Sequence, residues 1–183
     1  ALLGIDKEGL LSTDEKLEVL IARNAWQKEL IWNRFSMDQL GMSISQPDKV
    51  RRSSQTISVG NTGNWSTKNY LPMGCLKNKE TDSILFWQIE QNGSWYWEIS
   101  DQDGHMYLQL SGPTEHQSHW WKNLKPGDTF ASVPVSVGSA CGDVEEAAGE
   151  LTKYRRAIRR KNEDNEKLPV IFNDYMNCLW GDP

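Results

Sequence analysis

The stretch "SILFWQIEQNGSWYWEIS", residues 83–100, decides the fold class of this chain. Two apolar runs flank an Asn-Gly-Ser turn, and Asn and Gly both tolerate the positive φ that a tight hairpin requires. Along the second run Trp95, Trp97 and Ile99 share one face, while polar residues such as Glu98 share the other. One face is therefore predicted to be buried and the other solvent-exposed, as in a strand of an antiparallel sheet.

Short runs of the same kind continue on both sides of this hairpin. "LEVLIARNAWQKELIWNRFSM", residues 17–37, could pass for a helix, but its β-branched and aromatic content and its flanking turn signals favour strands. "HMYLQLS", residues 105–111, follows across an Asp-Gly turn. Strands at a regular spacing of about 8–12 residues predict an antiparallel β-sandwich.

The composition changes near Gly138. Apolar residues recur at helical spacing over residues 144–158, and Asp143 and Glu146 are placed as a capping pair, so a helix of about five turns is predicted. Its basic end, "RRAIRR", is interpreted as a solvated helix end, with a phosphate site as the alternative. We therefore expect a mainly β chain with three parts. These are a β-sandwich, N-terminally incomplete, over residues 1–140, a linker helix over 141–167, and the start of another unit, opening with a strand, over 168–183.

Composition excludes several classes of protein. The 183 residues include 25 acidic and 20 basic ones, a formal charge of -5, without the basic and aromatic stripe of a nucleic-acid surface. The sequence contains no apolar stretch of the roughly 20 residues that span a bilayer, so we expect a soluble protein. The three cysteines are predicted to be reduced and buried, which favours the cytoplasm. The first residue is not Met and the ending is abrupt, so we expect a piece of a longer protein.

The common catalytic and metal motifs are weak or missing. His116 and His119 form H-x-x-H, but the segment does not read as a helix and has no other zinc ligand at the usual spacing. "GNTGNW", residues 60–65, lacks the Lys of a phosphate loop and is interpreted as a turn. No nucleophile elbow is present, and the carboxylates on hairpins, Glu98 among them, are interpreted as surface residues. We expect neither a metal nor a cofactor.

Nine tryptophans are many for a chain of ordinary hydrophobicity. Those at alternating strand positions are predicted to lie in the core: Trp87, Trp95 and Trp97. Another group stands beside turn residues and is the candidate sugar-contacting set: Trp65, Trp120 and Trp121. An exposed indole face can stack on a sugar ring while polar neighbours bind its hydroxyls; simple packing is the alternative.

The closing stretch "LPVIFNDYMNCLWGDP", residues 168–183, is typical of a buried strand that delivers a ligand-facing loop. The apolar run after Pro169 is predicted to be the strand. The candidate substrate-binding residues follow it: Asn173, Asp174, Tyr175 and Trp180.

The order of several motifs resembles the α-galactosidases of glycoside hydrolase family 36. They are "AWQKE", "VRRSSQ", "ILFWQIEQNGSW", "LQLSGP", "LKPGDTF", "YRR" and "LPVIFNDY", and together they cover roughly residues 22–180. Members of that family have an amino-terminal β-supersandwich, a helical linker and a (β/α)8 catalytic barrel. The departure is at Tyr175, which takes the place of a pocket tryptophan; Trp180 is the candidate replacement.

The resemblance implies a parent enzyme that hydrolyses terminal α-galactosides by a retaining mechanism with two carboxylates, both beyond this chain. It also implies a missing catalytic barrel as partner, a homo-oligomer, and a sugar pocket whose first wall includes Asn173 to Trp180. We therefore expect no catalytic residue in this chain. Two alternatives stay open: an autonomous carbohydrate-binding β-sandwich module, and a purely structural interaction domain.

Overall fold

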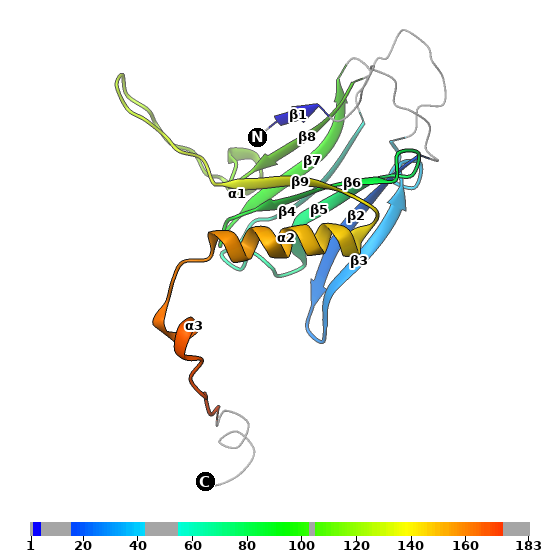
Figure 1. Ribbon diagram of the computed structural model, residues 1–183. Helices are drawn as coiled ribbons and strands as arrows, with labels where there is room; N and C mark the ends of the chain where they lie inside the picture. Colours follow the sequence, from blue (N-terminus) through cyan, green and yellow to red (C-terminus); the bar gives the residue numbers. More distant parts are fainter. Residues whose placement is uncertain (1, 5–15, 43–54, 103–104, 174–183) are drawn as a thin grey trace, which may run out of the picture. The chain divides into compact units, whose positions relative to one another are not determined.

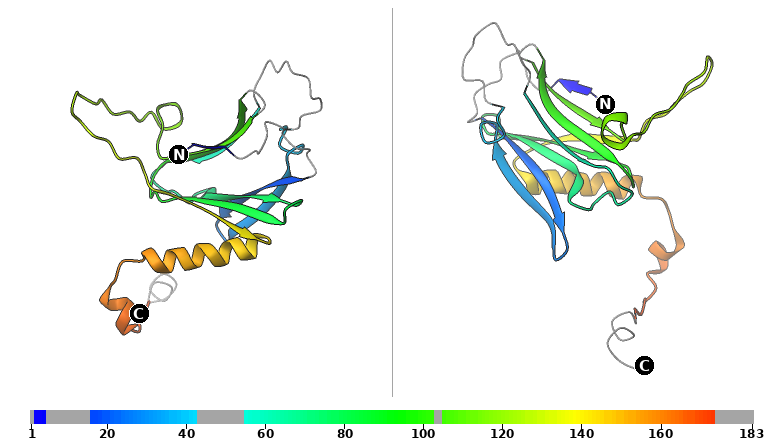
Figure 2. Two further views of the ribbon diagram at one scale, coloured as in Figure 1. Left: turned by 45° about the horizontal axis from the view of Figure 1, so that its top comes forward. Right: turned by 180° about the vertical axis from the view of Figure 1, so that it is seen from behind.

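The computed structural model describes residues 2–4, 16–42, 55–102 and 105–173. Over this part the protein is mainly β, with two antiparallel sheets that pack face to face, so the predicted β-sandwich is confirmed (Figures 1 and 2). The chain divides into two compact units, Ala1–Leu151 and Thr152–Pro183. The sandwich belongs to the first unit.

The larger sheet has five strands in the order β3-β2-β5-β6-β9. The ambiguous stretch of residues 17–37 forms its β2–β3 hairpin, as its β-branched content predicts. The strands of this sheet are β2 (Leu17–Ala25), β3 (Lys28–Ser36), β5 (Tyr70–Asn78), β6 (Ser83–Ile89) and β9 (Val135–Cys141).

The smaller sheet has four strands in the order β1-β8-β7-β4. Its strands are β1 (Leu2–Gly4), β4 (Thr56–Asn61), β7 (Trp95–Gln102) and β8 (His105–Ser111). β6 and β7, the two runs of the decisive stretch, therefore follow each other in the chain but belong to opposite sheets. The chain thus passes from one sheet to the other at the Asn-Gly turn. The turn signal predicts a simple hairpin, but β6 and β7 do not pair with each other.

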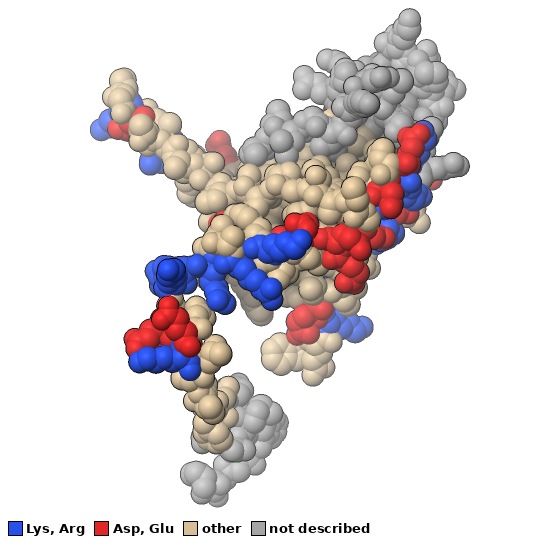
Figure 3. Space-filling model, viewed as in Figure 1, with Lys and Arg blue, Asp and Glu red and all other residues tan. Residues whose placement is uncertain are grey.

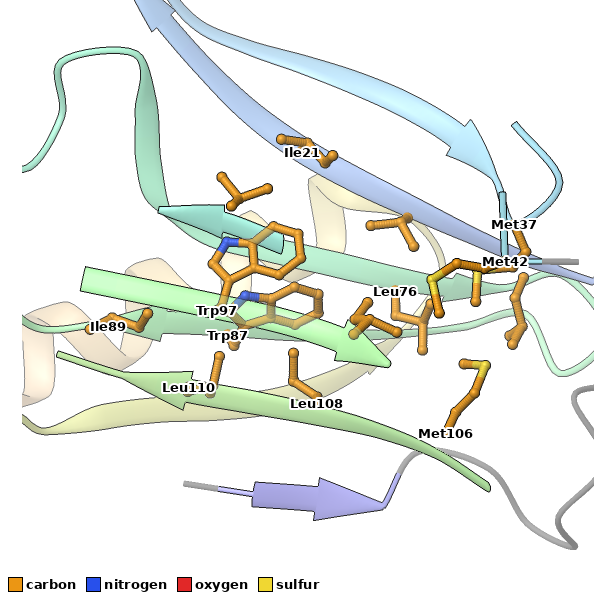
Figure 4. Packing of buried hydrophobic residues seen from close by; sticks show 14 of the residues in the cluster. Ile21, Met37, Met42, Leu76, Trp87, Ile89, Trp97, Met106, Leu108 and Leu110 are labelled. Atoms are coloured by element: carbon orange, nitrogen blue, oxygen red, sulfur yellow. The ribbon is translucent and has the colours of Figure 1, made fainter. Parts of the chain in front are cut away.

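The core between the sheets is built from the alternating residues of both (Figure 4). Trp87, Trp95 and Trp97 are each about 1% exposed or less, which confirms the prediction that they are core residues. Three methionines fill one end of the same core: Met37, Met42 and Met106. These large side chains account for much of the apolar burial that stabilises the sandwich.

The other face of the five-stranded sheet carries a second, smaller core. Leu20, Cys75 and Ile84 are buried there against Ala147, which lies in the first half of α2 (Val144–Ile158). The predicted capping pair is formed, since the amide of Asp143 donates to Glu146 Oε2 at 2.8 Å. Acidic residues gather over the start of α2 and basic ones over its end, as Figure 3 shows. That order suits the helix macrodipole.

Four expectations need correction. The H-x-x-H segment does contain a helical turn, α1 (Glu115–Ser118), and the predicted linker helix over residues 141–167 is not continuous, because a separate helix, α3 (Glu163–Lys167), follows α2. Both helices are so short that they depend on a side-chain N-cap, which is Thr114 for α1 and Asn162 for α3. Neither has the apolar periodicity by which a helix is recognised in a sequence. Cys141 is exposed at the end of an edge strand, although Cys75 is buried as expected; Cys178 lies outside the described residues.

The fourth correction concerns the apolar run after Pro169. Residues 168–173 are in neither a helix nor a strand, because no described segment pairs with them. Their large side chains are exposed: Leu168, Val170, Ile171 and Phe172. Over the described part of the chain, none of the helices combines the length and the apolar character needed to cross a membrane.

Candidate functional site

A pocket of about 380 Å³ lies at the carboxyl end of β8, where the chain leaves the four-stranded sheet. Its described walls come from three places: the β6–β7 turn, the end of β8, and the long excursion between α1 and β9. The lining residues are Gln91, Leu110, Ser111, Gly112, Pro113, Trp120, Phe130, Ala131, Ser132 and Val133. The volume lies in the range of small-ligand sites.

The floor of the pocket depends on a close backbone approach at Gly112. A Cβ built at this position would lie 2.6 Å from Val133 Cγ1, closer than packed atoms allow. Glycine therefore lets the returning end of the excursion pack directly on the chain that leaves β8. Pro113 follows and turns the chain into α1.

The end of α1 aims Trp120 at the pocket. His119 has a left-handed backbone, with φ of 51°, and its amide donates to Glu115 O at 2.9 Å. The amide of Trp120 then donates back to Thr114 O at 3.3 Å. This Schellman-like ending fixes the point at which the indole leaves the helix.

Trp120 and Phe130 form an aromatic wall. Their ring centroids are 5.6 Å apart with an interplanar angle of 37°, and the ammonium of Lys122 lies 5.3 Å from the Phe130 centroid. The excursion that carries all three, residues 119–134, projects from the sandwich in both views of Figure 2. Trp120 is 40% exposed, so part of its ring remains open to a ligand.

The chemistry of the pocket suits binding better than catalysis. Gln91, Ser111 and Ser132 supply hydrogen-bonding groups beside the aromatic wall, as a hydroxyl-rich ligand requires. None of the described residues that line it is a carboxylate, histidine or cysteine. A retaining glycosidase needs two carboxylates about 5–5.5 Å apart. The lining residues that the structure describes supply neither of them.

Trp65 and Trp121 are also exposed but do not line this pocket. Trp65, 63% exposed, lies on the β4–β5 loop, which is tied to the sandwich by two bonds: Trp95 Nε1 donates to Ser66 O at 2.6 Å and Asn24 Nδ2 to Thr67 O at 2.6 Å. Trp121, 62% exposed, is on the excursion. The structure therefore brings only Trp120 of the three predicted turn-borne tryptophans to the pocket.

The predicted carboxyl-terminal residues are separate from this site. Asn173 is an exposed residue of the second unit. Asp174, Tyr175 and Trp180 lie outside the described residues. The predicted sugar pocket at this end of the chain stays a prediction.

Sequence reasoning missed Phe130, Gln91 and Ser111 as pocket residues. Each of the three belongs to a motif that resembles family 36, and this was the one indication of a shared site in the sequence. The motifs are "ILFWQIEQNGSW" for Gln91, "LQLSGP" for Ser111 and "LKPGDTF" for Phe130. Spacing alone does not show that these three segments meet, because they are far apart in the chain.

No protein-family model matches the chain, and a search of curated proteins likewise returns no match.

Proposed function

We propose that this chain is the non-catalytic sandwich and linker of an α-galactosidase-like glycoside hydrolase, and that the Trp120–Phe130 pocket binds an α-galactoside or another sugar. The catalytic carboxylates of such an enzyme belong to a barrel domain that acts as the partner of this sandwich. Three cysteines, with Cys75 buried as a free thiol, favour a cytoplasmic location for it.

The observation that carries this proposal is the composition of the pocket. An aromatic wall, one side-chain amide and two hydroxyls surround a space of about 380 Å³, which is the combination of stacking surface and hydrogen-bonding groups that a sugar requires. Residues from three of the motifs that resemble family 36 line this one pocket. The resemblance and the pocket thus support the same class of ligand.

A fluorescence titration tests the binding. Raffinose or galactose added to the full chain should quench tryptophan emission to saturation, and Trp120→Ala should remove that change. Trp121→Ala is the matched control, because Trp121 is exposed on the same excursion but outside the pocket. An unchanged emission in the original chain, or an equal response in the Trp120→Ala variant, contradicts sugar binding here.

An activity assay tests the non-catalytic part of the proposal. The chain alone should release no more aryl leaving group from an aryl α-galactoside than buffer does. Turnover above that blank would contradict the assignment of catalysis to another domain. If the titration fails and the activity is also absent, the chain is a scaffold and not an autonomous carbohydrate-binding module.

The β2–β3 hairpin tip supports the further proposal that the protein forms a homo-oligomer. Trp26 is 87% exposed in the turn, and Leu30 and Ile31 beside it are 52% and 41% exposed. Large apolar groups at one projecting tip are typical of protein contacts. Sedimentation of the original chain and of Trp26→Ser should show self-association that the variant weakens.

A further inference from the structure

The outer face of the four-stranded sheet has an unusual composition. Its described outward positions on β4, β7 and β8 are occupied almost entirely by hydroxyl-bearing and small polar residues, with Glu98 as the one charged side chain. These positions are Thr56, Ser58, Gly60, Tyr96, Glu98, Tyr107, Gln109 and Ser111, with the buried Ser100 between them. Solvent-exposed sheet faces usually carry charges of both signs. This face differs, because its one described charged side chain is a carboxylate.

Two tyrosines converge on Glu98. Tyr96 OH donates to Glu98 Oε2, and Tyr107 OH donates to Glu98 Oε1 at 2.9 Å. The strand register fixes the arrangement, because Glu98 is directly opposite Ser58 on β4 and Gln109 on β8. The cluster therefore lies on the middle of a rigid ladder and not on a loop.

The cluster carries a negative charge that no described cation neutralises. Within the described part of the chain Glu98 has no ion pair, and its hydrogen bonds are those from the two phenols. Burial, together with the bond to Glu98, raises the pKa of Tyr96 to about 12, so this phenol stays neutral and keeps its proton for the carboxylate. The free lone pairs of the cluster can then only accept hydrogen bonds.

We propose that this face binds a protonated amino sugar, with the ammonium group against Glu98 between the two tyrosines and the ring hydroxyls along Ser58 and Gln109. An ammonium has three donors and no acceptor, which matches a cluster of acceptors with one negative charge. A cation also interacts favourably with the faces of tyrosine rings. The neighbouring hydroxyl and amide groups match the hydroxyls of a sugar.

This site is distinct from the pocket. Glu98 and the two tyrosines are not among the pocket residues, and Ser111 is the one outward position of the sheet that also lines the pocket. The pocket has no described acidic lining residue and suits a neutral sugar, whereas the outer face suits a cationic one. Binding at one site therefore does not depend on binding at the other.

Calorimetric titration with glucosamine at low salt tests the proposal, at about pH 6, below the pKa of an aliphatic amine. We expect saturable binding to the full chain that weakens as salt is added. N-acetylglucosamine keeps the sugar ring but has no charge, and methylammonium keeps the charge but has no ring. Both should bind at least about tenfold more weakly than glucosamine, since charged hydrogen bonds are roughly twice as strong as neutral ones and the ring adds further contacts.

Two variants localise the binding. Glu98→Gln keeps the size of the side chain and removes the charge, so glucosamine should bind at least about tenfold more weakly. Tyr107→Phe, which keeps the ring and removes one hydroxyl, should weaken binding less. Glu145→Gln, an equal charge change on the exposed side of α2, is the control and should bind as the original chain does.

The proposal is overturned if glucosamine gives no saturable heat, if N-acetylglucosamine or methylammonium binds as tightly, or if Glu98→Gln binds glucosamine unchanged. Unfolding midpoints measured on each variant identify any that has lost its fold. In that case the salt dependence and the two comparison ligands, all measured on the original chain, still decide the outcome.

Discussion

Trp87 and Trp97 meet edge to face across the two sheets, with ring centroids 5.2 Å apart and an interplanar angle of 76°. Both are fully buried, and neither indole N–H has a hydrogen-bond partner among the described residues. They therefore stabilise the sandwich by apolar burial and ring geometry and not by hydrogen bonding. The pair, visible near the centre of Figure 4, joins β6 of one sheet to β7 of the other.

Gly74→Ala should destabilise the protein through this pair. Gly74 is opposite Trp87 in the ladder, and an added Cβ would lie 2.5 Å from Trp87 Cζ2. The indole also packs edge to face against Trp97 and is fully buried, so we expect a loss of about 1–3 kcal/mol in the free energy of unfolding. Urea unfolding measures it. Gly149→Ala is the control: a Cβ there meets open space on α2, and alanine should stabilise the helix by up to about 1 kcal/mol. Equal effects of the two substitutions would contradict the close contact at Trp87.

Asp143→Asn should reduce stability more at neutral pH than in acid. Arg34 donates to both oxygens of Asp143, at 2.7 and 2.8 Å, and thereby lowers the pKa of that carboxyl below its usual 3.8. A group with a lowered folded-state pKa stabilises the fold above its unfolded pKa, and this contribution is lost as the pH falls through the folded value. Both side chains are partly exposed, so screening limits the effect to about 1 kcal/mol or less.

Urea unfolding at neutral pH and at about pH 2.5 checks this dependence. The difference between the original chain and Asp143→Asn should be largest at neutral pH and should shrink in acid. Asp38→Asn, at an exposed position, should show no such change. A difference that is equally large at the lower pH would show that the helix cap, and not the charge, carries the effect.

Lys77→Met should cost more than the loss of an ordinary surface lysine. The Lys77 side chain is 7% exposed, and its ammonium lies 2.5 Å from Asp82 Oδ1 and 2.5 Å from the carbonyl of Gly142, just before α2. Removal of the ammonium leaves that carbonyl without its donor, so we expect a loss of about 1–3 kcal/mol in the free energy of unfolding. Lys79→Met, on a lysine that is 45% exposed, should change stability by about 0.5 kcal/mol or less. Similar losses for the two variants would contradict the anchoring role of Lys77.

The sequence predicts the sandwich well because strand alternation and helix capping are patterns of neighbouring residues. Alternation in residues 95–99 identifies which side chains are buried, and the capping pair at Asp143 identifies where α2 begins. It does not reveal which sheet each strand joins, because an Asn-Gly turn serves equally for a hairpin and for a crossing between sheets. Pairing between distant segments depends on the whole chain.

The sequence predicts the candidate site less completely for the same reason. Trp120 could be selected because a tryptophan beside turn residues is unusual. Gln91 and Phe130 reach the pocket from segments about 40 residues apart, and no periodic pattern marks either of them. The Glu98 cluster needs the β7–β8 register, which places Tyr107 diagonally beside Glu98. The alternation along β7 alone does not distinguish Glu98 from any other carboxylate on the solvent-exposed face of a strand.

The two described cysteines should differ sharply in reactivity. Cys75 is buried between the five-stranded sheet and α2, and burial raises the pKa of its thiol to about 12, so almost no thiolate is present at neutral pH. Cys141 is exposed at the end of β9. In a Cys178→Ser background, a thiol-specific reagent should modify a single cysteine rapidly under native conditions, and the second should react only after urea unfolds the chain. A further Cys141→Ser substitution should remove the rapid phase. Rapid modification of both thiols in the folded protein would mean that the contact between α2 and the sheet opens readily, since the thiolate of Cys75 forms only when that core is exposed to water.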